Sequence, residues 1–228
     1  MKPARTAAAA LVGVLSVPIL ALAQAQAQQP AGPERWEPNV RKFEEADRQR
    51  RPPDGSMVFI GASSIVRWTT MAEDFPGLPV LNRGYGGSTF ADLTPYIDRI
   101  VVPYKPTKIV IYSGDNDLAR GKTPDEVVAD FKALLQVIHT RVPDAEVGLI
   151  ALKPSIARWD LVKSFLAVNF KLKEIDLEDD KLRFIDIEQQ MLGPNGQPDP
   201  EIFVPDGLHL SPKGYRIWTA AVMPFLRQ

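Results

Sequence analysis

Residues 108–151 decide the fold of this chain, and they read KIVIYSGDNDLARGKTPDEVVADFKALLQVIHTRVPDAEVGLIA. Two short apolar runs rich in β-branched residues, 108–112 and 146–151, have the length and composition of buried strands. Between them, Thr123 and Pro124 mark the start of a helix that Phe131, Leu134 and Ile138 continue at helical spacing. An order of strand, helix and strand is typical of a parallel sheet.

The same alternation extends in both directions along the chain. Three further apolar runs, at 57–60, 79–81 and 182–185, predict strands. Helical patterns occupy 90–101 and 161–177, and a last one starts at Ser211 and Pro212. We therefore expect an α/β fold in which five parallel strands carry helices on both faces, with the functional site outside the carboxyl ends of the strands.

The N-terminus has the pattern of a signal peptide. Lys2 and Arg5 form a charged start, residues 7–22 are apolar, and small residues from 23 to 27 offer cleavage sites. The apolar run is shorter than the about 20 residues that a membrane span needs, and Pro18 interrupts it. We expect residues 1–27 to be a signal peptide and cleavage region, so the protein is exported to the periplasm or secreted, with no stable membrane anchor after cleavage.

The composition excludes several classes of partner and chemistry. Loss of Lys2 and Arg5, with no acidic residue before Glu34, takes the net charge from -1 to -3, which argues against nucleic acid as a partner. The chain has no Cys, so disulfides, thiolate chemistry and a lipoprotein anchor are excluded. Nothing in residues 34–228 resembles an interdomain linker, and we expect a single domain there. The sequence does not indicate the oligomeric state.

Polar motifs follow the first two predicted strands. Gly61-Ala-Ser63-Ser64 comes where the chain must turn from sheet into helix. Its serines either cap that helix or lie where free backbone N–H groups stabilise a developing anion. Residues 82–88, NRGYGGS, form either a simple turn or a loop whose glycine N–H groups face an oxyanion. This loop lacks the Lys of a P-loop and the spacing of a dinucleotide fingerprint, which argues against nucleotide binding.

A polar motif also follows the third predicted strand, and another precedes the last predicted helix. Asn116, after the third strand, carries an amide that can donate to an oxyanion without charge. Asp115 and Asp117 beside it have neither clustered His nor the spacing of a calcium loop, so we expect no metal there. Asp206 and His209, three residues apart, can leave one turn together as an acid and a base.

Together these four motifs resemble the blocks of the SGNH hydrolases, also called the GDSL esterase and lipase superfamily. That family carries a Ser, a Gly, an Asn and an Asp-x-x-His in this order, and the resemblance covers residues 57–211. It implies a three-layer α/β/α sandwich of the flavodoxin-like kind. This chain has Ala62 where the family usually has Asp, so Ser63 is favoured on its spacing from Gly61 and Ser64 is the alternative.

The resemblance assigns a role to each matched residue. Ser63 is the expected nucleophile, His209 the base and Asp206 its partner. The backbone of Ser63, the backbone of Gly87 and the Asn116 side chain form the expected oxyanion hole, with Gly86 as the alternative glycine. No cofactor or metal is implied, and the motifs identify no further substrate-binding residue.

The expected reaction is therefore serine-dependent hydrolysis of small acyl esters, with an acetylated carbohydrate among the candidate substrates. Two alternatives share the same residues: acyl transfer to a sugar or cell-wall acceptor, and a binding module without catalysis. His139, near the end of the 124–138 helix, is expected to interact with the last carbonyls of that helix. Arg158, after the fourth strand, is expected to border the pocket and to meet an acidic or sugar-bearing substrate.

Overall fold

The computed structural model describes residues 32–228. The signal peptide expected at residues 1–27 lies outside these described residues. Within them, no helix combines the length and the apolar character that crossing a membrane requires.

Five parallel strands form one sheet in the order β2-β1-β3-β4-β5. The strands are β1 (Met57–Gly61), β2 (Val80–Asn82), β3 (Lys108–Tyr112), β4 (Glu146–Ile150) and β5 (Leu182–Ile185). Their bounds agree with the five predicted runs to within one residue. The order, with β1 between β2 and β3, is that of flavodoxin-like folds. The predicted five-stranded parallel α/β fold is confirmed.

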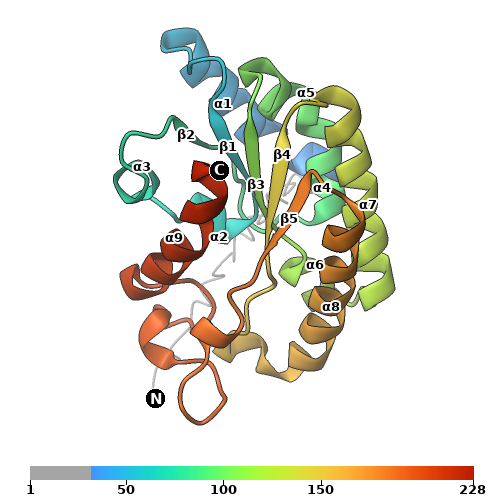
Figure 1. Ribbon diagram of the computed structural model, residues 1–228, viewed down its shortest axis with the longest axis vertical. Coiled ribbons are helices and arrows are strands. Elements are labelled where there is room, and N and C mark those ends of the chain that lie inside the picture. The colour runs from blue at the N-terminus through green and yellow to red at the C-terminus, as the bar shows by residue number, and fades with distance from the viewer. Residues whose placement is uncertain (1–31) are drawn as a thin grey trace, which may run out of the picture.

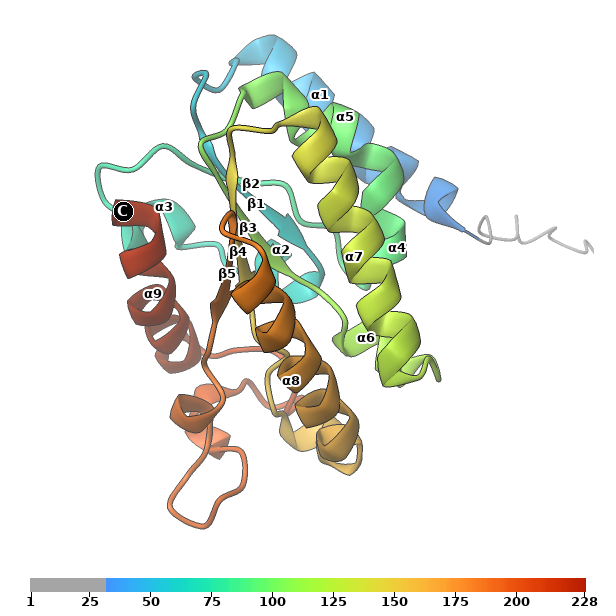
Figure 2. The same ribbon diagram turned by 45° about the vertical axis from the view of Figure 1, so that its right-hand side comes forward.

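Helices cover both faces of the sheet and make three layers (Figure 2). One face carries α4 (Phe90–Leu93), α5 (Ile97–Ile100), α7 (Pro124–Arg141) and α8 (Val162–Glu178), with α1 (Glu37–Gln49) against α5. The other face carries α9 (Pro212–Arg227) and the short α3 (Met71–Asp74). Two short helices, α2 (Ser63–Val66) and α6 (Asp115–Ala119), begin where β1 and β3 end.

The long helices begin at the residues that the sequence indicated. Thr123 and Glu126 form a capping box at the start of α7, and the Ser211 side chain accepts from the Gly214 N–H at the start of α9. The helix expected at 90–101 is instead divided into α4 and α5 by a turn of 3-10 helix at Thr94–Tyr96. Pro95 lies in that turn, and a proline has no N–H to continue an α-helical ladder.

The α1 helix was not predicted, because its side chains give almost no apolar stripe. Val40 is its only buried residue. Ion pairs hold the helix in place, since Arg99 of α5 lies 2.6 Å from Glu37 and 2.7 Å from Glu44. With α1 held in this way, Trp36, the residue before the helix, lies against the loop that follows β2. Its ring is 3.6 Å from the position that a Cβ on Gly87 would occupy.

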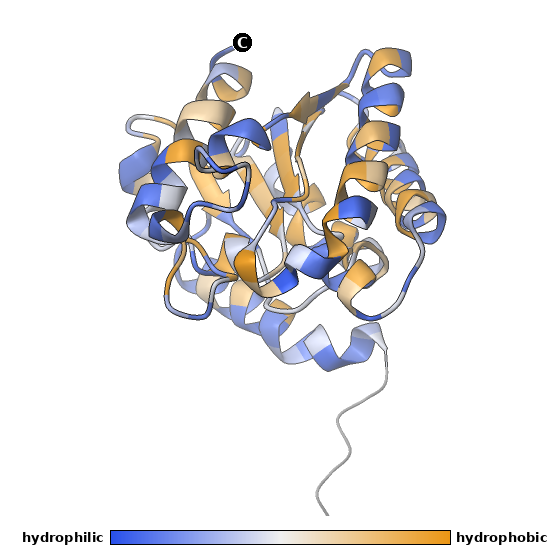
Figure 3. Ribbon diagram, turned by 90° about the horizontal axis from the view of Figure 1, so that it is seen from below, coloured by the Kyte–Doolittle hydropathy of each residue, from blue (hydrophilic) through white to orange (hydrophobic). Residues whose placement is uncertain are grey.

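The hydrophobic core fills the space between the sheet and the helix layers. Figure 3 shows hydrophobic residues along the strands and on the inward sides of the surrounding helices. All five residues of β3 are buried. On the α9 side, Trp68 stacks on Tyr215 with ring centroids 5.3 Å apart and meets Trp218 edge-on. This aromatic packing fixes α9, and with it the turn that precedes α9, against the sheet.

Candidate active site

The carboxyl end of the sheet brings together the segments that follow β1, β2 and β3 and the turn that precedes α9. This edge is the lower end of the sheet in Figure 1. Parallel strands all end at the same edge, which is why motifs far apart in the chain meet there. Each predicted site residue lies in one of these four segments.

Ser63 is placed by a tight turn at the end of β1. Gly61 has φ +137°, and a Cβ there would lie 1.9 Å from the Tyr112 carbonyl oxygen of the neighbouring strand. Only glycine fits this position, since other residues rarely adopt that φ and the side chain would strike β3. The chain then enters α2 at Ser63, a helix start that no side chain caps. Its first N–H groups therefore remain free for a ligand.

Ser63, rather than Ser64, reaches the histidine. Ser63 Oγ lies 2.9 Å from His209 Nε2. Ser64 is buried, and its carbonyl accepts a hydrogen bond from the Tyr215 hydroxyl of α9. The two serines thus point to different surroundings, and Ser64 contributes to the packing of α2 against α9.

Asp206 and His209 leave one turn, as their spacing suggested. His209 Nδ1 lies 2.6 Å from Asp206 Oδ2. The other oxygen, Asp206 Oδ1, accepts from the backbone N–H groups of Leu208 and His209, each at 2.9 Å. The turn closes at Gly207, whose φ is +64°. One carboxylate therefore both shapes the turn and holds the imidazole.

The charge on Asp206 determines the tautomer of His209. Partial loss of solvent disfavours the charged form, but hydrogen bonds from the His209 ring and from two backbone N–H groups hold the pKa of Asp206 well below its usual range. An ionised carboxylate only accepts hydrogen bonds, so His209 Nδ1 carries the proton and donates it. In a neutral ring Nε2 is then free to accept the proton of the Ser63 hydroxyl.

The glycine loop after β2 lies directly beside Ser63. A Cβ on Gly86 would be 4.0 Å from the Ser63 Cβ, while Gly87 has φ +76° and its carbonyl accepts from Arg120. Within the part of the chain that the structure describes, the N–H groups of Gly86 and Gly87 donate to no protein acceptor. The loop thus offers two free donors next to the serine, and both glycines remain candidates.

Asn116 lies in α6 with its amide held at both ends. Its Nδ2 donates to the Ser88 carbonyl at 3.0 Å, and its Oδ1 accepts from Arg158 Nη2 at 2.9 Å. An amide nitrogen has two N–H groups. One of them therefore remains for a ligand at this edge of the sheet.

Three charged residues form a cluster beside Asn116 that no sequence motif had grouped with the site. Asp115 Oδ2 lies 3.3 Å from Lys153 Nζ and 3.1 Å from Arg158 Nη1. Burial raises the pKa of Asp115, but the two cations outweigh it and hold that pKa below its usual value. The position of Lys153 directly after the fourth strand was the available signal, since polar residues at strand ends favour a site.

The neighbouring Asp117 has a different environment. It is fully buried and pairs with Lys122 at 3.2 Å. Burial raises its pKa to about 6 despite that lysine. In the described residues 32–228, no group of His, Asp and Glu side chains has the arrangement of a metal site.

The second histidine has no part in this edge of the sheet. His139 lies near the end of α7, and its Nε2 is 2.7 Å from Asp179 Oδ2. The expectation that it interacts with the last carbonyls of its own helix was wrong, because the turn before β5 brings a carboxylate within reach. This contact joins α7 to that turn.

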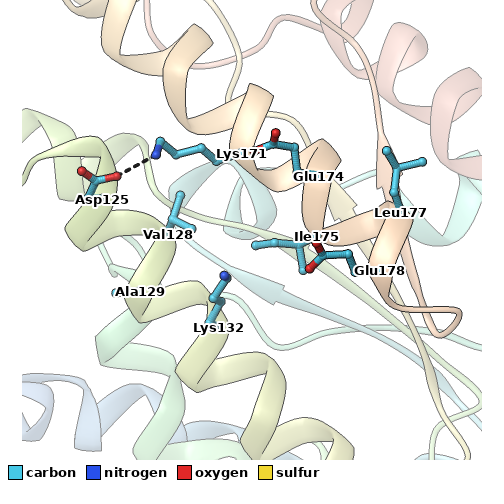
Figure 4. Close-up of a pocket in the computed structure, with 9 residues that line it drawn as sticks. All are labelled: Asp125, Val128, Ala129, Lys132, Lys171, Glu174, Ile175, Leu177 and Glu178. Carbon is cyan, nitrogen blue, oxygen red and sulfur yellow. Dashed lines mark ion pairs between the residues drawn. The ribbon is translucent and has the colours of Figure 1, made fainter.

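A groove of about 600 Å³ between α7 and α8 also lies apart from Ser63 (Figure 4). Figure 4 shows Lys171 of α8 pointing toward Asp125 of α7, and their charged groups are 2.8 Å apart. The lining side chains are Asp, Glu, Lys and aliphatic residues. No hydroxyl, thiol or imidazole lies among them, in contrast to the edge of the sheet that carries Ser63 and His209.

Comparison with known proteins decides the family. Residues 61–217 match the model of the GDSL-like lipase/acylhydrolase family, and the match covers all four motifs described above. The chain belongs to this family. The resemblance that the motifs indicated is confirmed.

Relatives and solved structures agree with this membership. The chain is 29% identical over 127 residues to platelet-activating factor acetylhydrolase IB subunit alpha2 of Homo sapiens, an alignment that covers 54% of this chain and 53% of that protein. The chain thus spans about half the length of the curated relatives it matches.

Among solved structures, a GDSL-like lipase from Bacteroides thetaiotaomicron is similar with a TM-score of 0.71 at 20% identity, covering 83% of this chain and 97% of that one. An acetylxylan esterase from Geobacillus stearothermophilus, solved as a catalytic mutant, has a TM-score of 0.61 at 19% identity over 76% and 95% of the two chains. At such identities the likeness establishes the shared fold.

Proposed function

We propose that this protein is a carboxylic ester hydrolase that cleaves small acyl esters through an acyl-enzyme on Ser63. The observation that carries the proposal is the continuous line of hydrogen bonds from Asp206 through His209 to Ser63, with distances of 2.6 and 2.9 Å. These distances lie in the range that proton transfer between a nucleophile and its base requires. Membership of an acylhydrolase family supports the same class of reaction.

In this mechanism His209 Nε2 takes the proton of Ser63 as Oγ attacks the ester carbonyl. Asp206 keeps the ring in the tautomer that accepts this proton and stabilises the imidazolium that results. The oxyanion is held by the N–H of Ser63, by the N–H of Gly87 and by the free N–H of Asn116. His209 then protonates the departing alcohol, and a water molecule releases the acyl group by the reverse path.

The names of the relatives suggest which acyl group to test first. The curated relatives are acetylhydrolases, and one structural neighbour is an acetylxylan esterase. We propose acetyl as the preferred acyl group and include acetylated sugars among the candidate substrates. We also propose that the protein is exported, on the pattern of residues 1–27, and N-terminal sequencing of the mature protein tests this.

The experiment is a panel of 4-nitrophenyl esters from acetate to palmitate, together with acetylated xylose and acetylated chitooligosaccharides. We expect the acetate to be hydrolysed fastest. The Ser63→Ala variant should lose about 10⁴- to 10⁶-fold in kcat, whereas Ser64→Ala, the adjacent matched control, should lose less than about tenfold. Near-parental hydrolysis by Ser63→Ala would refute the mechanism, and an acylated sugar as the main product would indicate acyl transfer.

A further inference from the structure

A buried cluster of charges lies behind the proposed oxyanion hole. Lys153, Asp115 and Arg158 form it, and their side chains are 1%, 7% and 17% exposed. Charged groups are costly to bury, so they persist in an interior only when paired or functional. None of the three takes part in the steps described above, and Arg158 contacts the Asn116 side chain directly.

We propose that Arg158, paired with Asp115, which Lys153 in turn holds in place, is a positioning residue that fixes the Asn116 amide in the orientation that stabilises the oxyanion. The inference rests on the proposed function and deepens it. It assigns to this cluster the task of presenting an N–H, and not the amide oxygen, to the reacting carbonyl.

An Asn amide is nearly symmetric in shape. The oxygen and nitrogen of an Asn side chain have nearly the same shape, so packing alone does not distinguish the two orientations. An amide turned by 180° would present Oδ1 to the oxyanion and repel it. A catalytic Asn therefore needs partners that distinguish its two ends.

Asn116 has one such partner at each end. A guanidinium only donates, so Arg158 Nη2 at 2.9 Å requires an oxygen in front of it. A carbonyl only accepts, so the Ser88 oxygen at 3.0 Å requires an N–H. The two contacts select the same orientation and leave the second N–H of Asn116 for the ligand.

Arg158 is in turn fixed from behind. Its Nη1 lies 3.1 Å from Asp115 Oδ2, and the same oxygen lies 3.3 Å from Lys153 Nζ. Lys153 also donates to the Tyr112 hydroxyl at 3.0 Å, and it lies 5.0 Å from the centre of that ring. Tyr112 is the last residue of β3, so the sheet itself anchors the cluster.

The cluster also contributes charge to the site. The Arg158 guanidinium, which stays protonated, places its positive charge directly against the Asn116 amide. A hydrogen bond from a guanidinium polarises the amide and makes its N–H a stronger donor. Both effects increase as negative charge develops on the substrate oxygen, so they act on kcat more than on substrate binding.

A double-mutant cycle tests this role with 4-nitrophenyl acetate, a neutral ester. Arg158→Met should lower kcat about 10- to 100-fold and change KM by less than about threefold. In an Asn116→Ala background the same change should cost less than about threefold, because there is no amide left to position. Arg158→Lys keeps the positive charge but loses the planar guanidinium that donates from two nitrogens, and it should also lower kcat. This variant replaces Arg158→Met in the cycle if the Met variant does not fold.

Lys108 supplies a matched control for Lys153. It is a buried lysine with an acidic partner, Glu146 at 2.8 Å, and an aromatic ring, Phe225, 4.8 Å away. It lies at the opposite end of β3 from the site. Both Lys153→Met and Lys108→Met should lower the melting temperature, but only Lys153→Met should lower kcat, by about 5- to 30-fold.

Three results would overturn the inference. Equal losses from Arg158→Met with and without Asn116 would show that the two residues act independently. A raised KM with unchanged kcat would show that Arg158 binds the substrate itself. A loss of kcat in Lys108→Met as large as that in Lys153→Met would show a general effect on stability. Ser63→Ala separates these from a failure of the proposed function, because full activity in that variant removes the serine mechanism altogether.

Discussion

Replacing Asp206 by Asn should slow ester hydrolysis more than replacing it by Ala, although Asn has the closer shape. Asp206 Oδ1 accepts two backbone N–H groups at 2.9 Å, from Leu208 and His209. An Asn keeps both bonds only if its oxygen takes that place. Its Nδ2 then faces His209 Nδ1 as a donor, which forces the proton onto Nε2. A protonated Nε2 in a neutral ring does not accept the proton of Ser63.

The structure sets the size of this effect. Turning the Asn amide over would restore the productive tautomer but would lose two hydrogen bonds of about 0.5–1.5 kcal/mol each. At about 1.4 kcal/mol per factor of ten, this total of about 1–3 kcal/mol lowers the productive form to between about one in five and one in a hundred and forty. The Asp206→Ala variant also loses the negative charge, but it does not force the His209 proton onto Nε2. Because the Asp206 side chain is 42% exposed, water can take its place beside His209 Nδ1. We expect about 10²- to 10³-fold loss for Ala and about 10³- to 10⁴-fold for Asn.

The assay is kcat for 4-nitrophenyl acetate, with the melting temperature of each variant as a check on folding. Asp199→Asn is the matched control. Asp199 also caps a turn, through the Glu201 N–H at 3.0 Å, and it pairs with Lys213 away from His209. The Asp199→Asn variant should keep the parental kcat. Equal or higher activity of Asp206→Asn compared with Asp206→Ala would refute the assignment of the two carboxylate oxygens.

Three further predictions concern stability and are checked by urea unfolding. Gly61→Ala should cost more than about 4 kcal/mol, because its Cβ would lie 1.9 Å from the Tyr112 carbonyl oxygen; a near-parental midpoint would contradict this. Burial raises the pKa of Asp117 to about 6, so the folded protein binds this proton more tightly than the unfolded chain. The resulting contribution to the free energy of unfolding is fully present below about pH 4 and is lost as the pH rises through 6. Asp117→Asn should abolish that fall of up to about 3 kcal/mol, and an unchanged pH profile would be evidence against it. Tyr215→Phe should cost about 1–3 kcal/mol, since the buried Ser64 carbonyl loses its donor at 2.9 Å, and should leave kcat within about twofold.

Much of the fold was predictable because its signals are local. The alternation of short apolar runs with helical patterns predicted five strands within one residue of their bounds. The capping box at Thr123 and the cap at Ser211 marked two helix starts. Sequence patterns failed where burial is slight, as in α1 with Val40 alone buried, and where Pro95 interrupts a helical pattern. In α1 contacts from other segments decide the local conformation, whereas at Pro95 the missing backbone N–H interrupts the helix.

The site was predictable in its residues but not in its partners. Ser63 and Asn116 were identified from motifs at strand ends and Asp206 and His209 from a motif before the last helix, and the structure brings Ser63 and His209 together. Their catalytic roles stay predictions until the variants are measured. Arg158 was expected to meet a substrate, and its guanidinium instead contacts Asn116 and Asp115. No periodicity or spacing indicated that contact, because the residues come from different strand ends.

By itself, the sequence determined the fold class, the four motifs and the edge of the sheet at which they meet. These follow from hydrophobic periodicity and from the rule that parallel strands end at one edge. Only the tertiary structure decided which serine reaches His209 across 146 residues of chain, and which charges surround Asn116. Side-chain contacts of that kind depend on how separate strands and helices pack against one another, and this packing leaves no local pattern in the chain.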